Sequence, residues 1–108
     1  MSSKSLIIIP TYNERDNVNA IIDAILNLDD DFNLLIVDDN SPDGTANIVR
    51  GLQNRYQGRL HLESRKGKLG LGTAYIFGFK WALKRDYNFI FEMDADFSHD
   101  PNDLPKLL

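Results

Sequence analysis

Three short apolar runs and one alternating segment, separated by segments with helical spacing, constrain the fold of this chain more than any other feature. The apolar runs cover residues 5–9, 32–37 and 88–93, and residues 59–63 alternate around Leu60 and Leu62. Each has the length of a buried strand. Between the first two, apolar residues recur from Val18 to Leu26 at the i, i+3, i+4, i+7 spacing of an amphipathic helix. Strands that alternate with helices predict an α/β fold with a parallel sheet and right-handed crossovers.

The expected sheet has the strand order 3-2-1-4, with helices on both faces, in one unit over residues 1–108. In this order the chain reverses direction between strands 1 and 4, and ligands bind beyond the carboxyl ends of the strands at such a point. We expect Pro10 to end the first strand, because proline has no N–H to donate. The expected helix over residues 73–85 is apolar on two faces, and a last helix begins near residues 101–108. Both features predict the truncated N-terminal part of a larger domain.

Composition excludes several classes of protein. With 43% hydrophobic and 26% charged residues, the 108-residue chain is neither a disordered polymer nor a coiled coil. It has no cysteine, which excludes disulfides and zinc-thiolate sites. No apolar run approaches the roughly 18 residues of a membrane span, and residues 1–5 are too short for a signal peptide. We expect a cytoplasmic location and no nucleic-acid partner.

Charge is segregated along the chain. Residues 1–49 carry nine acidic and two basic side chains, residues 50–85 nine basic and one acidic, and residues 86–108 six acidic and one basic. A basic middle between acidic flanks favours an anionic ligand held beside metal-binding carboxylates. The alternative is a set of solvated helix faces.

Carboxylates follow the expected strands at one edge of the sheet. Asp94 and Asp96 come after the fourth strand, two residues apart, so in extended chain they point the same way. Two such carboxylates suit Mg²⁺ or Mn²⁺ with phosphate oxygens as the remaining ligands, or they cap a helix. The residues that follow strands 1 and 2 at this edge are Pro10, Tyr12, Glu14, Asp38 and Asp39.

A basic, glycine-rich stretch covers residues 66–73. It lacks the Gly-Lys-Ser/Thr of a Walker A loop and the G-x-G-x-x-G spacing of a dinucleotide site. Its glycines allow a ligand to approach the backbone closely, and its lysines are mobile cations. A flexible surface loop is the alternative.

Four ordered motifs resemble those of family 2 glycosyltransferases with the GT-A fold, and within them polyprenol (dolichol) phosphate mannose synthases. The motifs cover residues 9–14, 37–45, 67–75 and 93–101. The resemblance implies a Rossmann-like nucleotide-sugar-binding half. It also implies inverting, metal-dependent transfer of mannose from GDP-mannose to a polyprenyl (dolichyl) phosphate. Because catalytic domains of this family are longer than this chain, we expect the 108-residue piece to have little transferase activity alone.

The resemblance also implies roles for individual residues. It assigns the guanosine part of the donor to Pro10, Tyr12, Glu14, Val37 and Asp39. Asp94 and Ala95 would lie against the ribose and diphosphate, and Lys68 would add a donor contact. Asp94 and Asp96 would act in catalysis through Mg²⁺ or Mn²⁺, with Ser98 as a third ligand where some relatives have glutamine.

The physical chemistry is consistent with that reaction. A metal neutralises the charge that develops on the departing diphosphate. The acceptor is a phosphate monoester, which is already anionic near neutral pH and needs no general base. The basic residues Arg65, Lys66 and Lys68 are suited to a phosphate or to an anionic membrane surface, which favours the cytoplasmic face of a membrane.

Three alternatives remain open from the sequence. One is a family 2 transferase with another donor, such as UDP-glucose, or another acceptor. A second is a nucleotide-binding fragment without activity. A third is a receiver-like signalling domain, because residues 35–39 resemble the acidic pair of receivers, with Asp94 as the phospho-acceptor. Receivers carry that pair after their first strand, whereas here it follows the second.

Overall fold

The computed structural model describes residues 4–29, 31–67 and 70–94. The elements in chain order are β1 (Ser5–Thr11), α1 (Arg15–Leu26), β2 (Phe32–Asp38), α2 (Thr45–Gln53), β3 (Leu60–Ser64), α3 (Leu71–Leu83) and β4 (Phe89–Glu92). All strand pairs are parallel, and the sheet order is β3-β2-β1-β4. The predicted α/β class and strand order are confirmed.

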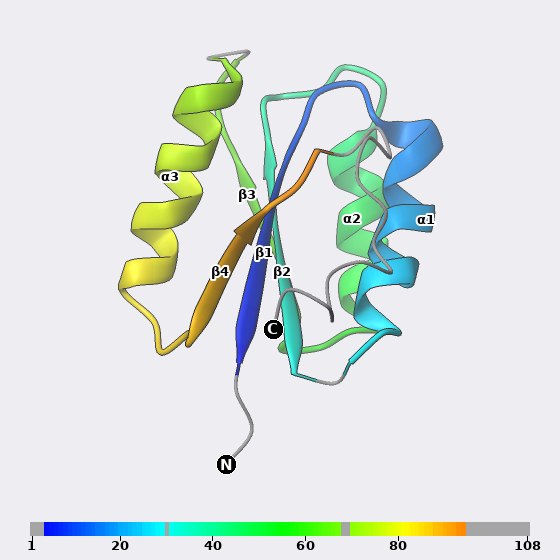
Figure 1. Cartoon of the computed structure of the whole chain (residues 1–108). Coiled ribbons are helices and arrows are strands. Elements are labelled where there is room, and N and C mark those ends of the chain that lie inside the picture. The colour runs from blue at the N-terminus through cyan, green and yellow to red at the C-terminus, as the bar shows by residue number, and fades with distance from the viewer. Residues whose placement is uncertain (1–3, 30, 68–69, 95–108) are drawn as a thin grey trace.

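Helices cover both faces of the sheet, as predicted. Helices α1 and α2 lie on one face and α3 lies on the other (Figure 1). Alternate residues of β1 divide between the two cores: Ile7 and Ile9 pack with α1 and α2, whereas Leu6 and Ile8 pack with α3. Because β1 is covered on both faces, it reads in the sequence as a continuous apolar run rather than an alternating one.

Pro10 does not end the first strand, so that prediction is wrong. β1 continues to Thr11, and Pro10 lies opposite Val37 of β2. Residues of one strand point their N–H and C=O groups to alternate sides, and the Thr11 carbonyl accepts from the Asp39 N–H on the β2 side. Pro10 therefore faces the β4 side, where β4 has already ended at Glu92. Its missing N–H leaves no bond of the β1–β2 ladder unmade.

Helix α3 is apolar on two faces, as the sequence predicted. Its inner face buries Ala74, Trp81 and Ala82 against the sheet. Its outer face exposes large apolar side chains: Ile76, Phe77, Phe79 and Leu83. Phe77 is the least exposed of these four, at 37%.

Close contact between α3 and β1 depends on Gly78. A Cβ atom at this position would lie 2.6 Å from Cγ2 of Ile8. No real side chain tolerates such a distance without a shift of one element. The absence of a side chain therefore fixes how closely α3 approaches the sheet.

Candidate functional site

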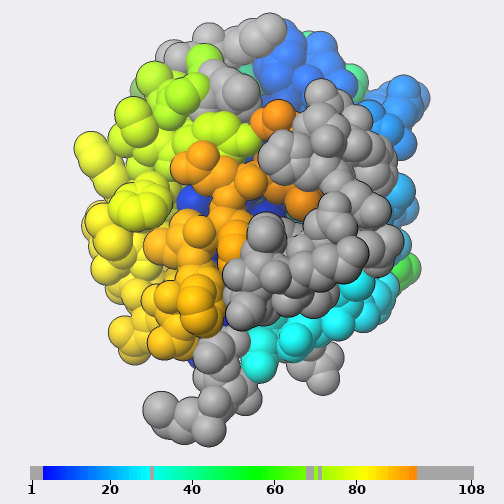
Figure 2. All heavy atoms as spheres, viewed as in Figure 1, coloured from blue at the N-terminus to red at the C-terminus, as the bar shows by residue number. Residues whose placement is uncertain are grey.

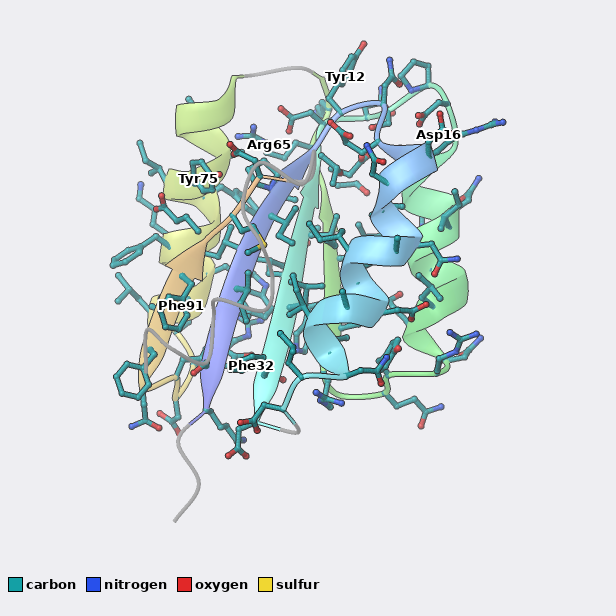
Figure 3. The ribbon with its side chains drawn as sticks, turned by 45° about the vertical axis from the view of Figure 1, so that its right-hand side comes forward. Tyr12, Asp16, Phe32, Arg65, Tyr75 and Phe91 are labelled. Carbon is teal, nitrogen blue, oxygen red and sulfur yellow. The ribbon has the colours of Figure 1, made fainter. Side chains whose placement is uncertain are left out.

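The loops that follow β1 and β2 are joined at the carboxyl end of the sheet. The Asn13 N–H donates to Oγ of Ser41 at 2.9 Å, and the Glu14 N–H donates to Oγ1 of Thr45 at 3.1 Å. Figure 3 shows Tyr12 and Arg65 at this end of the sheet, opposite the end that holds Phe32. Segments about 30 residues apart in the chain thus form one preorganised surface.

Asp43 holds the start of α2 in this surface. Its carboxylate accepts from the Thr45 N–H at 3.0 Å, from the Thr45 hydroxyl at 2.5 Å and from the Arg15 N–H at 3.2 Å. Burial alone would raise the pKa of Asp43, but these hydrogen bonds and the charge of Arg15 together lower it below its ordinary value. Asp43 therefore acts as a structural anion that joins α1 to α2.

Asp38 is also a structural residue. Its side chain accepts from the Thr11 hydroxyl at 2.7 Å, the Ser41 hydroxyl at 2.6 Å and the Ser41 N–H at 3.0 Å. The residue is 1% exposed. These donors fix the turn after β2, in which Asn40 adopts a left-handed backbone with φ of 58°.

Asp39 forms a bidentate ion pair with Arg65. Nε of Arg65 lies 2.6 Å from Oδ1 and Nη2 lies 2.9 Å from Oδ2. Less than a tenth of either side chain is exposed. Arg65 donates further to Oγ1 of Thr73 at 3.1 Å and to the Gly70 carbonyl at 3.3 Å. The pair thus links the end of β2 to the start of α3 in a fixed orientation.

Asp94 follows β4 on the other side of β1. The hydroxyl of Tyr75, on α3, donates to Oδ1 of Asp94 at 2.7 Å. Both side chains are partly buried. The sequence interpretation did not assign a role to Tyr75, although the residue lies in one of the four motifs.

The other predicted site residues have diverse surroundings. Tyr12 and Glu14 are half-buried in the loop after β1, and Pro10 is half-buried in β1 itself. The Val37 side chain is fully buried in the core, so a ligand meets only its backbone. Four predicted residues lie outside the described part of the chain: Lys68, Ala95, Asp96 and Ser98.

Within residues 4–29, 31–67 and 70–94, no three acidic or histidine side chains form a cluster suited to a metal ion. Of the predicted ligands, the described residues include Asp94 alone. Its carboxylate, held at the carboxyl end of β4, is the type of hard oxygen donor that Mg²⁺ and Mn²⁺ take. Thus Asp94 fits such an ion as one ligand of a larger set.

A groove of about 320 Å³ lies beside this surface, between α3 and β4. It is lined by Tyr75, Ile76, Phe79, Lys80, Leu83 and Glu92. Figure 2 shows α3 and β4 together on one face of the molecule.

In the described residues, no helix is long and apolar enough to cross a membrane.

Comparisons with known proteins agree with this architecture. A family model described as glycosyl transferase family 2 matches residues 6–108. The chain therefore belongs to glycosyl transferase family 2. It spans about two fifths of the length of the curated relatives below.

Two curated relatives narrow the resemblance. The chain is 44% identical over 107 residues to polyprenol monophosphomannose synthase of Mycolicibacterium smegmatis, covering 99% of this chain and 40% of the relative. It is 43% identical over 103 residues to undecaprenyl-phosphate mannosyltransferase of Micrococcus luteus, covering 95% and 42%.

Among solved structures, the mannosyltransferase PcManGT of Pyrobaculum calidifontis, in complex with GDP-Man and Mn²⁺, is similar to this chain. The TM-score is 0.77 at 25% identity, over 89% of this chain and 28% of that one. The predicted GT-A type of fold is thereby confirmed.

Proposed function

We propose that this chain forms the donor-binding half of an inverting, metal-dependent mannosyltransferase, which transfers mannose from GDP-mannose to a polyprenyl phosphate. One geometric observation carries the proposal. The carboxylates of Asp39 and Asp94 follow β2 and β4 on either side of β1, at the point where the strand order reverses. Ligands of open α/β sheets bind at this point.

The relatives supply the chemical class of the substrates. Both are named as mannosyl-transferring enzymes that act on a polyprenyl-type phosphate, and they align over nearly all of this chain. The solved mannosyltransferase holds GDP-Man and Mn²⁺ on the same type of fold. We extend these substrates to the present chain, together with attachment to the cytoplasmic face of a membrane.

The residues divide into a nucleoside side and a metal side. On the nucleoside side, the guanosine lies against Pro10, Tyr12, Glu14, Val37 and Asp39. On the metal side, Asp94, Asp96 and Ser98 would hold Mg²⁺ or Mn²⁺, and Asp94, Ala95 and Lys68 would add contacts to the donor. When bound, the ion neutralises the charge of the departing diphosphate. The acceptor phosphate is already anionic, so no side chain of this chain acts as its base.

A transferase with a uridine donor is a second candidate. One solved structure similar to this chain, TarS of S. aureus, is in complex with UDP, at a TM-score of 0.72 and 25% identity.

Calorimetric titration with GDP and UDP, each with and without Mn²⁺, tests both candidates. We expect GDP to bind more tightly than UDP, and Mn²⁺ to strengthen the binding. Asp39→Asn is expected to weaken nucleotide binding about tenfold, because a charged acceptor is lost. Asp86→Asn is the matched control, since this exposed residue lies in the turn before β4, at the opposite end of the sheet. Tighter binding of UDP would support the second candidate, and binding of neither nucleotide would refute both.

A further inference from the structure

Tyr75 and Asp94 come from two elements whose relative position is fixed. Tyr75 lies one turn before Gly78, where α3 packs closely on Ile8 of β1. The residue before Asp94 is held by the same part of β1, because the Met93 N–H donates to the Ile8 carbonyl at 3.0 Å. The hydrogen bond between Tyr75 and Asp94 is therefore supported on both sides by rigid backbone.

A phenol donor on one carboxylate oxygen has two consequences. It restricts rotation of the Asp94 side chain, and it engages Oδ1 of the carboxylate with the protein. Hydrogen bonds to a charged acceptor are stronger than those between neutral groups, so the restriction is substantial. A hydrogen-bonding residue that does not itself bind the metal commonly orients a carboxylate that does.

We infer that Tyr75 is a positioning residue, which orients the Asp94 carboxylate toward the divalent cation and the donor diphosphate. The inference rests on the proposed function, since it concerns the same site. It assigns a role in ligand binding to helix α3, which contributes no residue to the nucleoside side. Tyr75 acts through Asp94 and does not itself contact the metal.

Tyr75→Phe is the direct test, because it removes one hydroxyl and retains the ring. The measurement is the Kd of GDP for this chain, by calorimetry, with and without Mn²⁺. We expect the strengthening of GDP binding by Mn²⁺ to fall about tenfold, the lower limit for loss of one hydrogen bond to a charged group. Binding without Mn²⁺ should change less than twofold.

Tyr87→Phe is the matched control. Tyr87 is half-buried and stacks on Trp81 at a ring-centroid distance of 6.3 Å, on the same side of the sheet as α3. Its hydroxyl is expected to have no effect on the Mn²⁺ dependence. Thermal unfolding of both variants shows whether a loss of stability accompanies the change in binding.

A double variant tests whether Tyr75 acts through Asp94. In an Asp94→Asn background the Tyr75→Phe change is expected to add nothing to the loss of Mn²⁺ dependence, because the carboxylate it orients is gone. Unchanged Mn²⁺ dependence in Tyr75→Phe, beside a parent chain that shows it, would overturn this inference alone. Equal effects of Tyr75→Phe with and without the Asp94 carboxylate would also overturn it. A parent chain that binds no GDP would refute the proposed function itself.

Discussion

Replacement of Arg65 by methionine tests the importance of the ion pair at the end of β2. The change removes both hydrogen bonds to Asp39 and leaves a carboxylate that is 7% exposed without its counter-charge. Removing one partner of a buried pair costs about 3–5 kcal/mol. We expect about 3 kcal/mol of lost stability, the lower limit, because the pair lies at the open end of the sheet.

Urea unfolding followed by tryptophan fluorescence measures this loss. Trp81 is the single tryptophan of the chain and is 9% exposed, so its emission reports the core beneath α3. With a urea m-value of about 1.5 kcal/mol/M for a chain of this size, the midpoint should fall by about 2 M. The double variant Asp39→Asn with Arg65→Met should regain about 1 kcal/mol, since the buried charge is then absent.

The control is Arg55→Met, which breaks the exposed ion pair with Asp23. Its nitrogen and oxygen lie 3.3 Å apart, and the two side chains are 63% and 34% exposed. Exposed pairs contribute about 0–1 kcal/mol, so this midpoint should move by less than about 0.7 M. If Arg65→Met were no more destabilising than Arg55→Met, the burial argument would be refuted.

Two further predictions concern packing and pH. Gly78→Ala should destabilise the fold by about 1–2 kcal/mol in the same urea assay, because its Cβ would meet Ile8 at 2.6 Å. Gly51→Ala, in α2 with open space around it, should instead stabilise the fold by about 0.5–1 kcal/mol. If both substitutions changed the stability in the same direction, the close contact between Gly78 and Ile8 would not explain the effect. Burial, with the charge of Arg85, lowers the pKa of His61 below its ordinary 6.5. The unfolded chain therefore binds the proton more readily, and stability falls as the pH drops below about 6.5. His61→Leu should lack this part of the pH dependence, and an unchanged slope between about pH 7 and pH 5 would exclude His61 as its source.

The backbone architecture was predictable from the sequence because it depends on local periodicity. Apolar runs, one alternating segment and helical spacing identified the four strands and the three described helices, and the common doubly wound topology predicted the strand order. The position of Pro10 within β1 was not predictable. Whether a missing N–H matters depends on which neighbour that side of the strand faces, and here the neighbour has ended at Glu92.

The hydrogen-bond partners of the site side chains were harder to predict than the backbone architecture. Asp38 and Asp39 are adjacent and chemically identical, yet one fixes a turn and the other pairs with Arg65. Successive residues at a strand end point in opposite directions, so their partners come from different segments. Arg65 lies 26 residues from Asp39, and Tyr75 lies 19 residues from Asp94. Pairings at such separations follow from the sheet order and not from any local pattern.

The structure shows what several basic side chains of the basic middle, residues 50–85, contact. Arginines of the basic middle are engaged by the protein itself: Arg59 donates to three backbone carbonyls beside β2, and the guanidinium of Arg85 lies 3.5 Å from the Trp81 ring centroid. Together with the pair of Arg65 and Asp39, these contacts are structural. Within the basic middle, the lysine next to the site, Lys66, is exposed. Because a lysine is a mobile, hydrated cation and a buried arginine is not, an anionic ligand beside this loop would meet Lys66 rather than Arg65.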